Sequence, residues 1–171
     1  QSREALPLHY AGGGRLQWKT ANELYLIGEP SREANTDLWL IDISKRTVRR
    51  VGTPASSGML ALARHAPLGV SLQKSGVYDI SLQLIHGNGN IITPLNLKSF
   101  PSKCIFEGTI LYCAVPRELP ARADWPEDYL KERFYTADTL ISYDTETGAE
   151  KNLYTDREPV IDAEQLAIFG N

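Results

Sequence analysis

The chain alternates apolar and polar residues in many short runs, and three of its segments repeat one pattern. In each segment, alternating apolar positions lead into a polar turn, and a second short run follows the turn. The three segments are 38–51 (LWLIDISKRTVRRV), 82–95 (LQLIHGNGNIITPL) and 140–153 (LISYDTETGAEKNL). Alternation with a period of two is typical of a strand that buries one face. We therefore predict a repeated pair of β-strands.

A second pair of short apolar runs precedes each of these segments. Segments 16–30 (LQWKTANELYLIGEP) and 103–116 (KCIFEGTILYCAVP) both follow the order strand, tight polar turn, strand and proline. Segment 60–72 (LALARHAPLGVSL) keeps the strand–turn–strand order more loosely. Each repeat unit is therefore predicted to hold four short strands.

The spacing of the units indicates the fold class. The second unit follows the first at about 44 residues, and the third unit is longer by about 14 residues. Four strands within a period in the low forties are the sequence signature of a β-propeller blade. We therefore predict that 1–171 is a single all-β domain, a β-propeller with blades at about 16–51, 59–97 and 103–154. A β-sandwich is the alternative, because it also has many short strands, but the aligned copies favour the propeller.

The ends of the chain do not complete a ring of blades. Segment 158–171 (EPVIDAEQLAIFGN) is expected to be the first strand of a fourth blade, and segment 5–11 an outer strand that pairs with a further blade. Because a propeller has typically four to eight blades, we expect a fragment of a larger propeller. The chain opens on Gln1 rather than Met, so we also expect a mature, trimmed or partial form that a membrane anchor could precede.

Both cysteines of the chain lie in 103–116, on either side of a Glu-Gly-Thr-Ile turn. If Gly108 and Thr109 form the two-residue loop of a type II′ hairpin, Cys104 stands opposite Cys113. That pair falls at a non-hydrogen-bonded position, where Cα atoms lie about 4.5 Å apart, as a disulfide requires. The register thus predicts a disulfide and an oxidising compartment. Two buried thiols, or a redox or metal role, are the alternatives.

Two motifs of the repeat resemble those of a known family. Segments Asp37–Asp42 (DLWLID) and Tyr143–Gly148 (YDTETG) resemble the third strand and turn of the WD40-like repeat of TolB-type β-propellers. The stretch LYCAVPRELP and the later WPEDYL resemble a group of uncharacterised exported propeller proteins of bacteria with very small genomes. These resemblances imply a propeller fold and an exported protein, and they imply no reaction. The middle unit departs from the pattern, because His86 takes the place of Asp42 and Asp144.

Composition and charge narrow the classes of partner. Apolar residues make up 42% and charged residues 23% of the 171 positions, which is ordinary for a globular protein. The net charge is −3, with 18 Lys and Arg against 21 Asp and Glu. This balance lacks the basic excess that neutralises phosphates, so we expect no nucleic-acid partner. We also expect no cofactor and no metal, because the three histidines lack the spacing of metal ligands.

The extra residues of the third unit lie between its second and third strands, at 117–138. Asp124, Pro126 and the acidic residues after them are typical of a helix start. Loops on a rigid scaffold commonly carry function, and aromatic and Arg side chains are common interface anchors. The predicted partner-binding residues are Trp125, Tyr129, Phe134, Arg133, Arg117 and Arg122. We expect the last two to steer an acidic partner. Alternatively, the aromatic side chains pack on the blade as a structural plug.

These observations lead to two expected functions from different classes. The first is a non-enzymatic propeller scaffold in the periplasm or on the cell surface, which binds a protein or cell-envelope partner. The second is the propeller part of an enzyme, either an accessory domain of a hydrolase or a glycosidase. Carboxylates that line a central funnel would favour the enzyme, whereas an apolar or plugged funnel would favour binding. The sequence has no Gly-x-Ser-x-Gly nucleophile motif.

Overall fold

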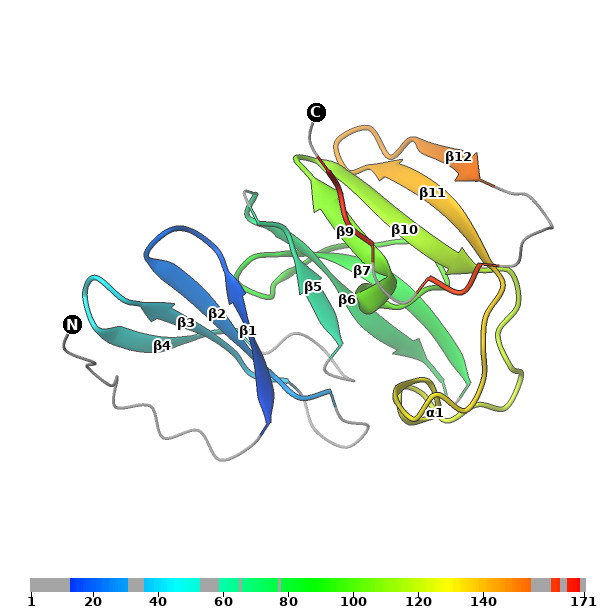
Figure 1. Cartoon of the computed structure of the whole chain (residues 1–171), viewed down its shortest axis with the longest axis horizontal. Helices are drawn as coiled ribbons and strands as arrows, with labels where there is room; N and C mark the ends of the chain where they lie inside the picture. The colour runs from blue at the N-terminus through cyan, green and yellow to red at the C-terminus, as the bar shows by residue number, and fades with distance from the viewer. Residues whose placement is uncertain are drawn as a thin grey trace.

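The structure is a computed structural model in which three four-stranded antiparallel sheets follow one another along the chain (Figure 1). It describes residues 13–30, 36–52, 59–64, 66–76, 78–154, 161–163 and 166–169. The first sheet contains β1 (Gly14–Trp18), β2 (Glu23–Gly28), β3 (Leu38–Asp42) and β4 (Thr47–Gly52). The second sheet contains β5 (Leu60–Leu62), β6 (Leu68–Ser75), β7 (Asp79–His86) and β8 (Ile91–Pro94).

The third sheet carries the insertion. Its elements are η1 (Pro101–Lys103), β9 (Cys104–Glu107), β10 (Ile110–Pro116), α1 (Glu127–Leu130), β11 (Asp138–Asp144) and β12 (Glu150–Tyr154). In all three sheets the strands lie in chain order, so β1, β5 and β9 occupy corresponding edges. The predicted all-β class is confirmed. The described part of the chain forms an open row of sheets (Figure 1).

The same irregularity recurs in all three sheets. The pairing of the third strand with the fourth shifts register between Leu38 and Trp39 in the first sheet. The shifts in the other two sheets fall between Leu84 and Ile85, and between Leu140 and Ile141. A β-bulge bends a strand and increases its twist. The shift begins four residues before Asp42 and Asp144 but two residues before His86, so the middle sheet shares the irregularity at a displaced position.

The aspartates of the DLWLID and YDTETG motifs shape the turn after the third strand. Asp42 Oδ1 accepts hydrogen bonds from Ser44 Oγ at 2.7 Å and from the Lys45 amide at 3.0 Å, and these bonds lower the pKa of Asp42. Asp144 Oδ1 accepts a bond from the Glu146 amide at 2.9 Å, which lowers the pKa of Asp144. Both aspartates therefore act as turn formers, a common role for this residue type.

The middle sheet packs against both of its neighbours. The core between the first and second sheets comprises Tyr25, Ile27, Leu38, Leu40, Leu60, Leu62 and Ile85. The larger core between the second and third sheets includes Val70, Leu72, Leu82, Leu84, Phe100, Leu111, Cys113, Trp125 and Ile141. Adjacent side chains of a strand point to opposite faces, which is why Leu84 and Ile85 belong to different cores. Both faces of this sheet are consequently buried.

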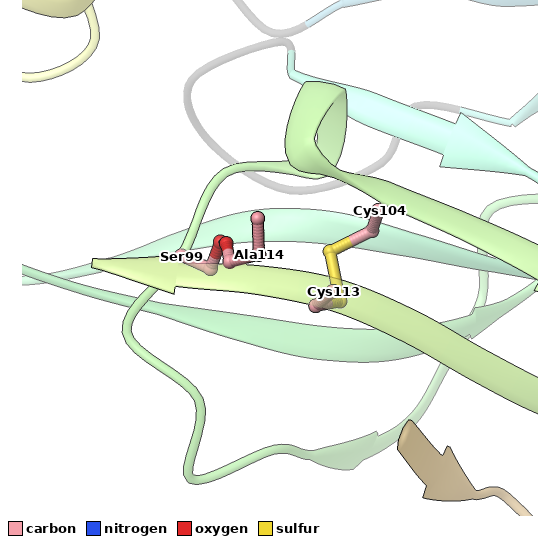
Figure 2. The surroundings of a disulfide bond; sticks show 4 residues. All are labelled: Ser99, Cys104, Cys113 and Ala114. Carbon is pink, nitrogen blue, oxygen red and sulfur yellow. A yellow bond between two sulfur atoms is a disulfide. The ribbon is translucent and has the colours of Figure 1, made fainter. Parts of the chain in front are cut away.

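The hairpin of β9 and β10 has the predicted register, with Glu107 opposite Ile110 and Cys104 opposite Cys113. The two cysteines form a disulfide, and their Cα atoms lie 4.2 Å apart (Figure 2). Gly108 has a φ of 59°, a conformation that glycine adopts without steric cost. The predicted disulfide is therefore confirmed, and it is consistent with an oxidising environment.

A serine fixes the same hairpin from the side of β10 that leads to the insertion. Ser99 Oγ donates a hydrogen bond of 2.6 Å to the carbonyl oxygen of Ala114, one residue after Cys113 (Figure 2). Both Ser99 and Ala114 are completely buried. The start of the third sheet is thus held by a covalent bond and by a buried hydrogen bond.

Two sequence predictions concern the ends of the chain. Segment 5–11 lies outside the described residues. Of the predicted fourth-blade strand at 158–171, the structure describes 161–163 and 166–169, and it assigns none of these residues to a strand. In the part of the chain that the structure covers, no helix is long and apolar enough to cross a bilayer.

We predict that the Cys104→Ala/Cys113→Ala double variant lowers the free energy of unfolding by about 2–3 kcal/mol, because a short cross-link restricts the unfolded chain. Urea denaturation of the oxidised wild type and the variant measures this difference. Intact-mass spectrometry without reductant serves as the control. The mass of the wild type should be lower by two hydrogen atoms than that of the reduced protein. Labelling of both thiols in folded, air-purified protein would contradict the assignment.

Candidate functional site

The insertion between β10 and β11 folds onto the core, and Trp125 is its anchor. The Trp125 side chain is 0% exposed. Its indole Nε1 donates a hydrogen bond of 3.0 Å to the carbonyl oxygen of Tyr78, and its ring meets Phe134 edge-on at 5.4 Å. Trp125 was predicted to contact a partner, but the structure places it in the core between two sheets. Trp125 therefore agrees with the alternative interpretation, in which the aromatic side chains of the insertion pack on the sheets as a structural plug.

Tyr129 and Phe134 pack beside Trp125. The Tyr129 ring stacks on Phe100 with 3.8 Å between centroids and an angle of 5° between planes. The Tyr129 hydroxyl lies 3.0 Å from Ser102 Oγ. Phe134 is half-buried against the same core. Because each buried aromatic side chain contributes on the order of 2 kcal/mol, these rings hold the insertion against the sheets.

The three arginines predicted to bind a partner lie at exposed positions. Arg133 forms an ion pair of 2.6 Å with Asp128. Asp128 also accepts a hydrogen bond from the Asp124 amide, and these contacts lower the pKa of Asp128. None of Arg133, Arg117 and Arg122 lines a cavity described below.

Two adjoining cavities lie where the insertion meets the first strands of the sheets, beside Gly14 at the start of β1 and Leu130 at the end of α1. We call them together the insertion groove, and they share Met59, Ser102 and Leu130. The larger cavity, of about 320 Å³, is lined by Gly14, Arg15, Ile27, Gly28, Glu29, Pro30, Leu60 and Pro101 besides the shared residues. The smaller cavity, of about 230 Å³, is lined by Tyr129, Glu132, Phe134, Tyr135 and Asp162 besides the shared residues.

The exposed apolar residues of the groove are ones that the sequence analysis missed. The Tyr135 side chain is 84% exposed and Leu130 is 45% exposed, although both lie among residues that pack inward. The helix that carries Leu130 spans one turn, Glu127–Leu130. A helix this short shows no apolar periodicity, so the sequence offers no signal that would assign these two residues to the surface.

A buried ion-pair network borders the smaller cavity and contributes Asp162 to its lining. Lys103 is 0% exposed, although lysine is almost never fully buried unless paired. Its Nζ donates to Asp138 Oδ2 at 2.7 Å, to Asp162 Oδ1 at 2.6 Å and to Thr136 Oγ1 at 2.7 Å. An ammonium group has three donors, and all three are used here. The network was not predicted from the sequence.

Charge and hydrogen bonding favour the ionised forms of Lys103 and Asp162. Burial alone would lower the pKa of Lys103, but the hydrogen bonds and charges of Asp138 and Asp162 outweigh burial and raise it. Burial alone would raise the pKa of Asp162, but the hydrogen bonds from Lys103 and Thr136 outweigh burial and lower it. The Asp138 carboxylate also accepts a bond of 2.9 Å from the Ala163 amide. The network therefore joins η1, the end of the insertion and segment 161–163.

A further cavity of about 370 Å³ lies where β1, β5 and β9 converge with segment 166–168. Gln17 Nε2 donates to the Leu62 carbonyl at 2.7 Å, and the Arg15 guanidinium donates to the Leu60 carbonyl. The charged side chains along its described lining are Arg15, Arg64 and Glu107. Within the described ranges, no group of three or more His, Cys, Asp or Glu residues is placed to hold a metal ion.

Neither a scan against protein-family models nor a search of curated proteins finds a match to this chain. Among solved structures, the chain is similar to a puromycin-hydrolysing peptidase of Mycobacterium tuberculosis, with 12% identity and a TM-score of 0.47. The alignment covers 91% of this chain and 21% of the peptidase chain, so this chain spans about a fifth of the peptidase's length. A similarity of this size assigns neither a family nor an activity.

We predict that Lys103→Met destabilises the protein by about 3–5 kcal/mol, because it leaves two carboxylates without their buried cation. Lys98→Met is the matched control. Lys98 pairs with Asp79 at 2.6 Å, but both side chains are more than half exposed, so its loss should cost under about 1 kcal/mol. Urea denaturation of both variants measures the difference. Equal effects of the two substitutions would contradict a structural role for the network.

The lowered pKa of Asp162 predicts how the stability of the folded protein depends on pH. Because this pKa is lowered by folding, the contribution of Asp162 is fully present above its unfolded pKa of about 4. It is lost as the pH falls through the folded pKa. The stability difference between wild type and Asp162→Asn should therefore be large at neutral pH and narrow below about pH 4. Thermal unfolding across this range tests it, and a difference independent of pH would contradict it.

Proposed function

We propose that the chain is part of a WD40-like, TolB-type β-propeller whose three sheets are successive blades. It acts as a non-enzymatic scaffold outside the cytoplasm, and it binds a protein or cell-envelope partner along the insertion groove. The common strand order and the repeated register shift support the blade interpretation. So does the convergence of β1, β5 and β9, since the first strand of each blade lines the axis of a propeller.

The insertion groove is the observation that carries the binding proposal. Leu130 lines both cavities and Tyr135 lines the smaller one, and both side chains are exposed. The walls of the larger cavity are mainly apolar. The insertion that presents them is fixed by Trp125 and by the stacked Tyr129. A surface that is ordered before binding loses little conformational entropy when a partner binds. A mainly apolar pocket with a few polar groups along its walls is the usual form of a binding site.

Two further observations support the proposed location outside the cytoplasm and the proposed non-enzymatic role. The Cys104–Cys113 disulfide favours an oxidising compartment outside the cytoplasm. The cavity between the first strands has Glu107 as the one carboxylate along its described lining. Glycoside hydrolysis uses a pair of carboxylates, so this lining favours binding over that reaction.

We expect peptides selected from a random phage-displayed library against the oxidised protein to bind in the insertion groove. Leu130→Ala and Tyr135→Ala should each weaken their binding by about tenfold, as expected for interface anchors. Fluorescence polarisation with the synthetic peptides measures the affinities. Trp18→Ala is the matched control, because Trp18 on β1 is 57% exposed but lines neither cavity of the groove.

The variants must keep the wild-type melting temperature, so that loss of binding is not loss of folding. If no peptide is enriched, or if Trp18→Ala weakens binding as much as Tyr135→Ala does, the groove is not the binding site.

A further inference from the structure

The smaller cavity of the insertion groove combines aromatic rings with carboxylates. Tyr129, Phe134 and Tyr135 contribute the rings, and Glu132 and Asp162 contribute the carboxylates. No lysine or arginine is among the described residues that line this cavity. The smaller cavity is therefore negatively charged, whereas the three arginines of the insertion suggested a positively charged site.

Glu132 is placed in the lining by the turn that ends α1. The Glu132 amide donates to the Tyr129 carbonyl at 3.0 Å, and the next amide, of Arg133, donates to the Asp128 carbonyl at 3.1 Å. Glu132 has a φ of 51°, in the left-handed region that side chains other than glycine rarely adopt. Its carboxylate forms no ion pair with any residue that the structure describes. Its charge is thus available to a ligand.

Asp162 adds negative charge to the lining of the cavity. Its side chain is 24% exposed, and it shares the Lys103 ammonium with the fully buried Asp138. One ammonium against two carboxylates leaves one excess negative charge. Asp162 accepts bonds from Lys103, Thr136 Oγ1 and the Thr136 amide, and a carboxylate has about four acceptor sites. The excess charge and that of Glu132 both act on the same cavity.

We propose that the smaller cavity binds a Lys or Arg side chain of the partner protein, while the larger cavity takes a neighbouring apolar side chain. This inference rests on the proposed function. A cation gains from the face of an aromatic ring and from charge-assisted hydrogen bonds to carboxylates. Phe134 and Tyr135 supply the rings, because Tyr129 is already stacked on Phe100.

The arrangement of the two cavities suits an extended segment of the partner. Residues i and i+2 of an extended chain point to the same side, about 7 Å apart. Adjoining cavities can therefore take an apolar side chain and a basic side chain two positions away. The expected partner is thus a protein with an apolar residue two positions away from a basic one.

The test compares two peptides that differ only in charge. The probe is acetyl-Gly-Leu-Ser-Arg-Ser-Leu-Gly-amide, and its neutral isostere has citrulline in place of arginine. NMR titration of the oxidised protein with each peptide gives the affinity and maps the site. We expect the arginine peptide to shift the resonances of Leu130, Glu132 and Tyr135 and to bind at least about tenfold more tightly than the citrulline peptide.

Glu132→Gln keeps the shape of the side chain and removes its charge, so it should reduce the preference for arginine to below about threefold. Glu146→Gln is the matched control, since Glu146 is an exposed residue of the turn between β11 and β12, and it should leave the preference unchanged. A preference that survives Glu132→Gln would overturn the inference.

The remaining outcomes separate this inference from the proposed function. If both peptides bind in the groove with equal affinity, the cavity does not select a cation, but the groove still binds peptides. If neither peptide shifts a groove resonance, the inference fails, and the result also counts against the groove as a binding site.

Discussion

The buried ammonium of Lys103 is the contact on which the third sheet and its insertion depend. Removing a charge from water costs several kcal/mol, and the cost is offset only when every hydrogen bond of the buried ion is made. Lys103 satisfies this condition with acceptors from Thr136, Asp138 and Asp162. Because Lys103 directly precedes Cys104, these bonds join the disulfide hairpin to the end of the insertion and to segment 161–163.

The insertion groove follows from this arrangement. Three aromatic side chains are committed to the core, so they fix the insertion and leave Leu130 and Tyr135 at the surface. The same network holds Asp162 in the lining of the smaller cavity. Stability and recognition thus overlap in this region. Trp125 and Tyr129 set the position of the insertion, Leu130, Glu132 and Tyr135 lie at the surface, and Phe134 and Asp162 belong both to the packed structure and to the cavity lining.

Local rules explain what the sequence could predict. The strands and their repeat were visible because alternation with a period of two is a property of neighbouring residues. The disulfide was predictable because a two-residue hairpin fixes its register, so the position of Gly108 determines that Cys104 faces Cys113. The turn aspartates Asp42 and Asp144 are local signals of the same kind.

Contacts between distant residues explain what the sequence could not predict. Lys103 pairs with residues that lie 35 and 59 positions away, and no periodic pattern links them. Whether Trp125 faces a partner or the core depends on how the insertion lies on the second and third sheets, which its own sequence does not determine. The arginines of the insertion suggested a basic site, but the number of arginines in a segment does not determine where their side chains lie.

We infer that the insertion groove is formed before any partner binds, with walls held by the Lys103 network. Native-state hydrogen exchange measures this directly at the amides of Thr136, Asp138 and Ala163, which donate to Asp162, Ile161 and Asp138 respectively. If the groove is preformed, these amides should exchange as slowly as those of β10 and β11 in the oxidised protein without ligand. Exchange at the rate of an exposed loop at these three positions, with the strands still protected, would contradict it.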